Sequence, residues 1–350
     1  MKCLGRIILG VSLGIALLTG VLAATANATL VYVTGGFPTS PPATPKPEWI
    51  WVARDDGSAA RRLVPGSGAR ISHNGREVLY SLYQSGHVRL MVVPAAGGHS
   101  RVVLDNWQDG VGVWSADSRT VAAVTGKELG TKRLIVIDVS SGRVMHTVAT
   151  GRDFSNVGYA PDGTQLIYTR MPSAGPGSDI DITSVKTWRT YALTDDDHSF
   201  GAVWGPQWIV FSRWRAPARS NDAPKVDLYL VKSSRAGLHR LTHTHPGFLL
   251  SGLTATAWSA SGSRLLAEFS GQDTSYACKV NPATGAVSRV GTPAQGLLGY
   301  GLSRDGRTIL ATTGGPDPDD SDVVAAPYSG GAMRILARHA HFPDWNAGMP

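Results

Sequence analysis

Short apolar runs separated by turn residues recur along this chain of 350 residues. The clearest copy spans 156–170, NVGYAPDGTQLIYTR, in which apolar runs at 157–159 and 165–169 flank the turn Pro161-Asp162-Gly163. Proline fixes φ at the first turn position, aspartate can accept a hydrogen bond from its own backbone, and glycine readily adopts positive φ. The pattern therefore predicts two antiparallel strands joined by a tight turn.

Similar phrases follow one another at a nearly constant spacing. The residues aligned with the first position of the turn are Ser72, Ser115, Ala160, Gly205, Ser259, Ser303 and Asn346, which are separated by 43, 45, 45, 54, 44 and 43 residues. Self-similarity at this period is the signature of a repeat architecture. A structure of stacked or radially arranged repeats is therefore expected.

A second kind of phrase, in which two β-type runs flank a turn and the second run ends near Leu, follows each of the first. Its copies span 50–63, 90–104, 134–148, 228–242, 276–290 and 323–336, and a weaker counterpart at 187–193 has lost its turn. Two phrases supply four short strands per repeat, which is typical of a propeller blade. We predict an all-β fold, a seven-bladed β-propeller of four-stranded blades, with six or eight blades as the range of error.

The two ends of the chain carry complementary parts of one repeat. Residues 343–346 form a first strand with no partner after it, and residues 30–34 read as a second strand with no first strand before it. We therefore predict a ring closed by both termini in one shared blade, with the innermost strand coming from the C-terminal end. Closure of this kind removes an open sheet edge.

The repeat resembles those of the TolB-like, WD-like β-propeller family. The family pattern P-x-W-S-P-D-G, I-A-F, I-Y-V, D-G, L-T is matched best by residues 159–163 with 166–168, and by residues 50–63. The resemblance covers residues 29–350 and implies the fold, whereas propellers host binding modules and enzymes alike. Seven predicted blades rather than six, and no separate α/β domain ahead of them, argue against the Pal-binding role of TolB itself.

Residues 1–28 have the features of a signal peptide. Lys2 and Arg6 precede an apolar stretch at 7–24, and Ala26-Asn27-Ala28 supplies a small-residue cleavage site. The alternative is an uncleaved membrane anchor, because the apolar stretch approaches spanning length. We predict a secreted or periplasmic protein with one propeller domain at 29–350, which meets a membrane only if the segment is retained.

Composition excludes several classes of function. Removal of Lys2 and Arg6 lowers the formal net charge from +7 to +5, and no Lys/Arg cluster indicates nucleic-acid binding. Cys3 leaves with the signal segment, so Cys278 is expected to form no internal disulfide. The sequence contains no G-x-S-x-G, P-loop or dinucleotide motif, which excludes the catalytic serine of propeller-containing peptidases.

Blade topology sorts the loops onto two faces. In a four-stranded up-and-down blade, the 1–2 and 3–4 turns share the short-turn face, whereas the 2–3 loops and the blade-to-blade links share the other, here called the long-loop face. The long segments at 35–48, 171–186, 214–226 and 314–322 should therefore lie on the same side. We predict that ligands bind there, because binding residues are concentrated on loops held by a rigid scaffold.

Ionisable residues of the long-loop face are the candidate ligand-binding residues. They are Asp195, Asp197, His198, Arg213, Arg215, His243, His245, His339 and His341. Two His-x-His pairs in equivalent links could each place both imidazoles on one strand face, and imidazole with carboxylate suits Zn or Mn. The preferred interpretation is that these groups bond to one another or to backbone, so no cofactor is predicted, with a divalent metal as the alternative.

Three other sets of residues have competing interpretations. The acidic stretches 179–181 and 317–322 are interpreted as solvated loops rather than Ca²⁺ sites, because they lack the spacing and the glycine of a Ca²⁺ loop. Arg213, Arg215 and Arg219 surround Trp214 and could hold an anionic or sugar ligand, although an ordinary basic loop is preferred. Tryptophans at equivalent repeat positions are predicted to pack between blades; they are Trp114, Trp204, Trp258 and Trp345.

Three functions follow from these features. The leading hypothesis is an exported, monomeric, non-enzymatic scaffold that binds a protein or cell-envelope ligand through the long-loop face. The alternative, implied by resemblance to seven-bladed oligogalacturonate lyases, is a metal-dependent carbohydrate lyase in which the link histidines hold metal and Arg213 or Arg215 meets the uronate carboxylate. A third is a structural surface or spore-coat component with the Pro-rich stretch 37–47 as an extended contact arm.

Overall fold

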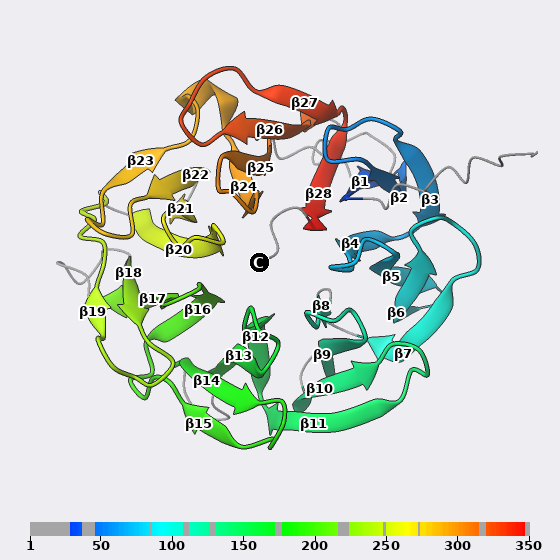
Figure 1. The fold of residues 1–350 in the computed structure, drawn as a ribbon, viewed down its shortest axis with the longest axis horizontal. Coiled ribbons are helices and arrows are strands. Elements are labelled where there is room, and N and C mark those ends of the chain that lie inside the picture. Colours follow the sequence, from blue (N-terminus) through cyan, green and yellow to red (C-terminus); the bar gives the residue numbers. More distant parts are fainter. Residues whose placement is uncertain are drawn as a thin grey trace, which may run out of the picture.

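The protein is an all-β propeller, with antiparallel strands arranged radially around a central axis (Figure 1). The computed structural model describes residues 29–36, 46–84, 86–107, 112–126, 130–171, 177–215, 224–247, 250–271, 274–314 and 320–346. Within these ranges a short 3₁₀ turn occurs at Pro293–Gln295. No helix in this part of the chain is long and apolar enough to span a membrane. The proposed signal peptide at 1–28 lies outside the described residues.

Hydrogen bonding groups the strands into five sheets, three of four strands and two of eight. The sheet that unites the two ends of the chain has the order β28-β1-β2-β3 and consists of β28 (Ala340–Trp345), β1 (Leu30–Gly36), β2 (Lys46–Ala53) and β3 (Arg61–Pro65). Two further four-stranded sheets are built from β12 (Asp153–Tyr159), β13 (Gln165–Met171), β14 (Asp179–Ser184) and β15 (Thr190–Ala192), and from β24 (Leu298–Leu302), β25 (Thr308–Thr312), β26 (Val323–Pro327) and β27 (Arg334–Ala337).

Each eight-stranded sheet is two consecutive sets of four. The first contains β4 (Ser67–Ile71), β5 (Glu77–Gln84), β6 (His87–Pro94), β7 (Arg101–Trp107), β8 (Val113–Trp114), β9 (Thr120–Gly126), β10 (Lys132–Asp138) and β11 (Val144–Gly151). The second contains β16 (Ser199–Trp204), β17 (Ile209–Arg215), β18 (Lys225–Val231), β19 (His239–Arg240), β20 (Leu250–Trp258), β21 (Leu265–Gly271), β22 (Ser275–Val280) and β23 (Val287–Arg289).

The predicted propeller of four-stranded units is confirmed, but hydrogen bonding does not separate it into seven sheets. In each eight-stranded sheet a single residue pair joins the two sets, Trp107 with Thr125 and Val226 with Gly252. Gly252 has φ of +134°, and a Cβ at this position would overlap the carbonyl oxygen of Val226. Glycine therefore allows β20 to approach β18 closely enough to merge the two sets.

The predicted closure of the ring is observed. β28 pairs antiparallel with β1, with Leu30 opposite Trp345 and Thr34 opposite Ala340. The innermost strand of this sheet thus comes from the C-terminal end and the other three from the N-terminal end, as Figure 1 shows where red β28 lies beside blue β1. Backbone hydrogen bonds between the two ends of the chain hold the ring together.

The predicted turn chemistry is also confirmed. Between β12 and β13, the Asp162 carboxylate accepts a hydrogen bond from the backbone N–H of Thr164 at 2.9 Å, and Gly163 has φ of +70°. The same device recurs where the Asp117 carboxylate accepts a hydrogen bond from the backbone N–H of Arg119 at 3.0 Å. Local residue choice therefore fixes these turns.

One strand was predicted in the wrong place. The third strand of its set is β14, within the stretch 171–186 that was interpreted as a loop, whereas residues 187–193 contain the next turn and the short β15. Asp179 and Asp181 interrupt the apolar pattern of β14, yet both are buried in the sheet, and Arg170 Nε donates to Asp181 at 2.9 Å. The interpretation of Asp179 and Asp181 as a solvated acidic loop is therefore wrong.

The repeat tryptophans pack between successive sets of strands. Trp114, Trp258 and Trp345 are buried, and the Trp114 indole N–H donates to the carbonyl of Arg70 in the preceding set at 3.2 Å. Trp204 is only half-buried. Cys278 is buried and forms no disulfide, and burial raises the pKa of its thiol to about 12. The core is thus held by apolar packing and strand pairing.

Candidate functional site

The long-loop face is organised around the buried carboxylate of Asp227, on β18. One of its oxygens accepts hydrogen bonds from the Thr242 hydroxyl at 3.0 Å and from the Thr244 backbone N–H at 2.9 Å. The other accepts from Arg215 Nε at 2.6 Å and from Arg240 Nη2 at 2.7 Å. Asp227 has no exposed side-chain surface, so the four partners replace the water that it loses. This carboxylate fixes the link between β19 and β20.

The charge state of Asp227 follows from these contacts. Burial opposes ionisation, but the hydrogen bonds from Thr244 and the charges of Arg215 and Arg240 outweigh it and lower the pKa of the carboxyl group. The ionised carboxylate therefore holds both guanidinium groups. Arg215 was predicted as a ligand contact. Its guanidinium also donates a hydrogen bond to the carbonyl of Thr244 at 3.2 Å, and it therefore stabilises the link between β19 and β20.

The link between β15 and β16 is held in the same way. Asp179, which begins β14, accepts hydrogen bonds from the Thr194 hydroxyl at 3.2 Å and from the backbone N–H of Asp196 at 2.8 Å. A third copy appears before β26, where Asp322 accepts from the backbone N–H of His339 at 3.1 Å. An aspartate near the start of a third strand thus anchors the following link in three different sets.

Sequence reasoning missed these anchors, although a signal was present. In two sets the aspartate precedes a Leu-Thr pair whose threonine lies 15 residues after it, at Asp179 with Thr194 and at Asp227 with Thr242. In both, the threonine hydroxyl also accepts from the backbone N–H that follows the aspartate, at 2.9 Å. The repeated spacing could have identified the pair as a structural unit.

The side chain of Arg213 also contacts other side chains of the protein. It forms an ion pair with Asp196, and its Nε donates to the Ser199 hydroxyl at 3.1 Å. Its guanidinium lies over the Tyr229 ring, 4.7 Å from the centroid. Arg213 and Arg215 therefore stabilise the links of the long-loop face, here also called the rim. Arg219 lies outside the described residues.

The predicted histidines lie on three separate links. His198 follows β15, His243 and His245 follow β19, and all three side chains are exposed. His339 is exposed and His341 is 6% exposed, so this pair does not place both imidazoles on one face. The prediction that these two histidines contact a ligand stays a prediction. β28 buries the imidazole of His341, whose Nε2 lies 3.9 Å from Oε1 of Glu48.

The described residues do not fit the alternative of a bound divalent metal. Within this part of the chain no three His, Cys, Asp or Glu side chains are grouped so that they could hold a metal ion. Asp195 and Asp197 are exposed, and the backbone of Asp197 is used to accept a hydrogen bond from Ser178 N–H at 3.1 Å. The acidic residues at 317 and 319 lie outside the described ranges.

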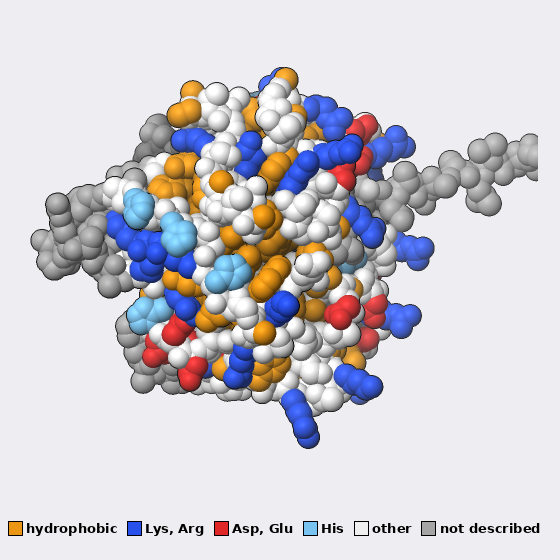
Figure 2. Space-filling model, turned by 60° about the vertical axis from the view of Figure 1, so that its left-hand side comes forward, with side chains coloured by type: hydrophobic (Ala, Val, Ile, Leu, Met, Phe, Trp, Pro, Cys, Tyr) orange, Lys and Arg blue, Asp and Glu red, His pale blue; other side chains and the backbone are white. Residues whose placement is uncertain are grey.

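An exposed aromatic side chain accompanies these links. Trp214, near the end of β17, is 38% exposed and lies 5.3 Å from the ring of Phe200. Its backbone N–H donates to the carbonyl of His198 at 2.9 Å, which connects β17 to the link. In Figure 2, histidine and basic side chains gather at the left-hand edge of the molecule. The rim thus combines aromatic, imidazole and fixed charged groups.

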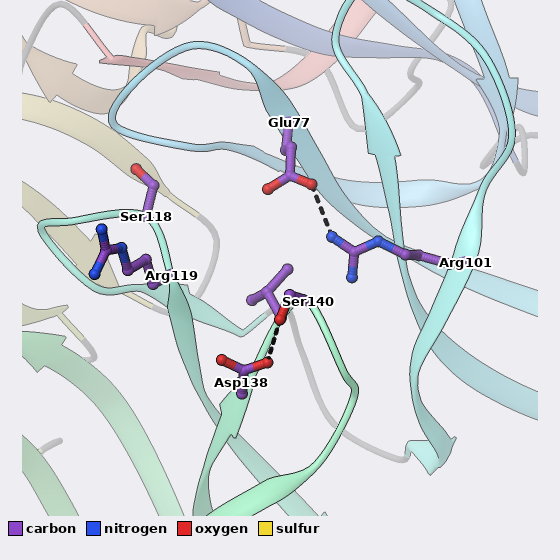
Figure 3. A pocket seen from close by; sticks show the side chains of 7 residues that line it. Glu77, Arg101, Ser118, Arg119, Asp138 and Ser140 are labelled. Carbon is purple, nitrogen blue, oxygen red and sulfur yellow. Dashed lines mark hydrogen bonds and ion pairs between the residues drawn. The ribbon is translucent and has the colours of Figure 1, made fainter.

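A second candidate site lies on the short-turn face. A cavity of about 330 Å³ separates the sets β4–β7 and β8–β11, lined by Glu77, Arg101, Ser118, Arg119, Asp138, Val139 and Ser140 (Figure 3). Its walls come from neighbouring repeats, so no single repeat phrase indicates it. Other described hollows, beside Tyr191 with Arg235 and beside Trp208 with Trp258, lie on this same face.

The cavity is lined by charged groups of both signs. Arg101 Nη2 pairs with Glu77 Oε1 at 2.8 Å. Asp138 accepts hydrogen bonds from the hydroxyl of Ser140 at 2.6 Å and from that of Ser141 at 2.7 Å, which lower the pKa of its carboxyl group to about 2. The sequence analysis assigned candidate binding residues to the long-loop face alone, and therefore did not indicate this cavity.

Comparison with known proteins identifies the fold. No protein family model matches the sequence, and no curated protein matches it. Among solved structures, the propeller domain of the Trilobed protease from Pyrococcus furiosus is 12% identical, with a TM-score of 0.65, over 89% of this chain and 93% of that one. TolB from Acinetobacter baumannii is 15% identical, with a TM-score of 0.55, over 90% and 82%. The chain therefore shares the β-propeller fold of these proteins.

A third similar structure bears on the enzyme hypothesis. An oligogalacturonate lyase in complex with manganese is 14% identical to this chain, with a TM-score of 0.56, over 90% of this chain and 86% of that one. Identity at this level establishes a shared fold and carries no activity. The P. furiosus propeller is described as having an open velcro topology, whereas here β28 and β1 are joined by hydrogen bonds.

Proposed function

We propose that this propeller is an exported, non-enzymatic scaffold that binds a protein or cell-envelope component through its long-loop face. The observation that carries the proposal is the anchoring of successive links by buried aspartates, Asp179 and Asp227, which hold exposed side chains in place. Preorganised surfaces bind with a smaller entropy loss than mobile ones. The signal-like segment at 1–28 supports a secreted or periplasmic location.

The chemistry of the rim supports a polypeptide or another polar macromolecule as the ligand. Trp214 supplies a large aromatic surface, and His198, His243 and His245 supply hydrogen-bonding groups on the two links that β17 contacts. Aromatic residues are enriched at protein interfaces, where a rigid ring contributes contact area at low entropic cost. Arg213 and Arg215 keep the neighbouring links in register, because each is paired with an aspartate.

We infer that the protein acts as a monomer. We also infer a ring of seven blades, in which each half of the two eight-stranded sheets counts as one blade. The lyase alternative is not favoured, because the candidate histidines lie on three separate links and His341 is buried.

Substitution of exposed rim residues tests the proposal. We expect the double variant His243→Ala/His245→Ala and the single variant Trp214→Ala each to weaken binding of the purified protein to isolated cell envelopes of its source, by about tenfold for Trp214, as for an aromatic hot spot. Co-sedimentation at increasing envelope concentration measures the affinity. The control is Arg307→Ala, which changes an exposed side chain in a turn of the short-turn face. Unchanged binding by both rim variants, or equal loss in the control, would contradict the proposal.

A further inference from the structure

We infer that the hollow between the sets β12–β15 and β16–β19 is a binding site for the phosphate group of a small phosphate ester. Its lining combines one residue of β15, Tyr191, with three consecutive residues of the turn between β18 and β19, namely Ser233, Ser234 and Arg235. Its volume of about 540 Å³ is within the range for small-molecule pockets, which leaves room for an organic group beside the phosphate. These residues belong to the short-turn face, so the site is separate from the proposed long-loop surface.

The turns beside the hollow carry charge of one sign. The turn between β14 and β15 contains Lys186 and Arg189, and the turn between β18 and β19 contains Lys232 and Arg235. Neither turn contains Asp or Glu, and none of these four side chains forms an ion pair within the described part of the chain. A surface of one sign raises the local concentration of counter-ions. The hollow therefore favours an anion.

The lining offers unused hydrogen-bond donors. The guanidinium of Arg235 and the hydroxyls of Ser233 and Ser234 form no hydrogen bond with the other described residues. The guanidinium lies over the Tyr191 ring, 5.5 Å from the centroid, and this contact leaves its N–H groups without an oxygen acceptor. A guanidinium can pair with two oxygens of a phosphate, and the remaining oxygens can accept from hydroxyls. A carboxylate has only two oxygens, so a phosphate group matches this donor set better.

The hydroxyl of Tyr191 connects the two walls of the hollow. It donates a hydrogen bond to the carbonyl of Ser233 at 2.9 Å, across the boundary between the two sets. Within the turn, the backbone N–H of Lys232 donates to the carbonyl of Ala236 at 3.0 Å. The donors of this turn are therefore fixed before a ligand arrives, which reduces the entropy lost on binding.

The backbone of this turn departs from the equivalent turns of other sets. Arg235 has φ of +68°, and its N–H donates to the carbonyl of Lys232 at 2.8 Å. In three other sets the residue that makes the same turn hydrogen bond is a glycine with positive φ, at Gly57, Gly97 and Gly330. A residue with a Cβ pays a conformational cost in this region, and such outliers concentrate at functional sites. Arginine thus occupies a position where glycine would be less strained, and its side chain lines the hollow.

An NMR titration of the whole protein tests the inference with three probes at matched ionic strength, namely sn-glycerol 3-phosphate, inorganic phosphate and acetate. We expect glycerol 3-phosphate to cause saturable shifts of the backbone amides of Ser233, Ser234 and Arg235. Acetate offers fewer oxygens, and inorganic phosphate lacks the organic group, so each should bind about tenfold more weakly or not at all. Absence of saturable shifts, or either simple anion binding as tightly as glycerol 3-phosphate, would overturn the inference.

Substitution of Arg235 with glycine separates binding from stability. Arg235→Gly removes the guanidinium and installs the residue that the equivalent turns carry, so it should weaken binding of glycerol 3-phosphate by about tenfold without lowering the melting temperature. A purely structural role of Arg235 over Tyr191 predicts the reverse, a lower melting temperature with unchanged binding. That result would overturn the inference.

A second variant and a matched control locate the binding. Ser233→Ala/Ser234→Ala keeps the carbonyl that Tyr191 contacts and removes both hydroxyls, so it should also weaken binding by about tenfold. Arg143→Gln is the control, because Arg143 is an exposed arginine in the corresponding turn between β10 and β11 and does not line the hollow. It should leave binding unchanged. Equal weakening by Arg143→Gln would show attraction by net charge alone and contradict a specific site.

Discussion

Replacing Asp227 with alanine lowers the free energy of unfolding by about 3 kcal/mol, the lower end of the range for loss of one partner from a buried ion pair. The substitution removes the acceptor for Arg215, Arg240, Thr242 and Thr244 at once. The effect stays at the lower end because the two arginine side chains keep 28% and 26% of their surface exposed to water. Urea denaturation followed by tryptophan fluorescence measures the change.

The control for this prediction is Asp305→Ala. Asp305 caps a turn of the short-turn face, where its side chain is 59% exposed, so its loss should destabilise the protein far less than the loss of Asp227. Equal destabilisation by the two substitutions would show that Asp227 is not the anchor of the long-loop face.

The same carboxylate predicts a direction of pH dependence. The pKa of Asp227 is lower in the folded protein than its ordinary value, so the ionised group stabilises the fold above the unfolded-state pKa of about 4. This contribution disappears as the pH falls through the folded-state pKa. The stability difference between wild type and Asp227→Asn should therefore be full at neutral pH and shrink in acid, and a difference that grows in acid would contradict the assignment.

Replacing Trp345 with alanine should lower the free energy of unfolding by about 3–5 kcal/mol, as for other buried tryptophans. Trp345 is 6% exposed and packs with Leu30, Leu310 and Leu336 where the two ends of the chain meet. Its indole also lies against Gly301, where an added Cβ would be 3.2 Å from Nε1. The substitution therefore leaves a cavity beside the pair that closes the ring.

Hydrogen exchange distinguishes loosened closure from general destabilisation. Trp345→Ala should accelerate exchange of β1 amides more than exchange of β13 amides, because β1 pairs directly with β28. Trp214→Ala is the matched control: this residue is 38% exposed and its loss should cost less than about 1 kcal/mol. A small effect of Trp345→Ala would contradict its assignment to the core.

The sequence predicts those features that depend on local chemistry or on repetition. Asp162 and Gly163 are sufficient to indicate their turn, because each supplies a backbone requirement that other residues meet poorly. The closing pair of β1 and β28 follows from counting strands, since each end of the chain lacks the part that the other supplies. These predictions require no knowledge of distant contacts.

Features that depend on pairing between distant residues were not predictable in this way. β14 was missed because Asp179 and Asp181 look like loop residues until Thr194 and Arg170 are seen to bond to them. Ligand binding at the long-loop face stays a prediction, and the burial of His341 could not be foreseen because it depends on the path of the closing strand. The cavity on the short-turn face requires two neighbouring repeats, so its lining does not appear in either repeat alone.

Site-specific photo-crosslinking tests the proposed binding face most directly. A benzophenone amino acid placed at His243 samples the long-loop face, and the same group at Arg307 samples the short-turn face, both at exposed positions. Irradiation with isolated cell envelopes of the source should give a discrete adduct from His243 and none from Arg307. Adducts from Arg307 alone, or equally from both positions, would contradict recognition through the long-loop face.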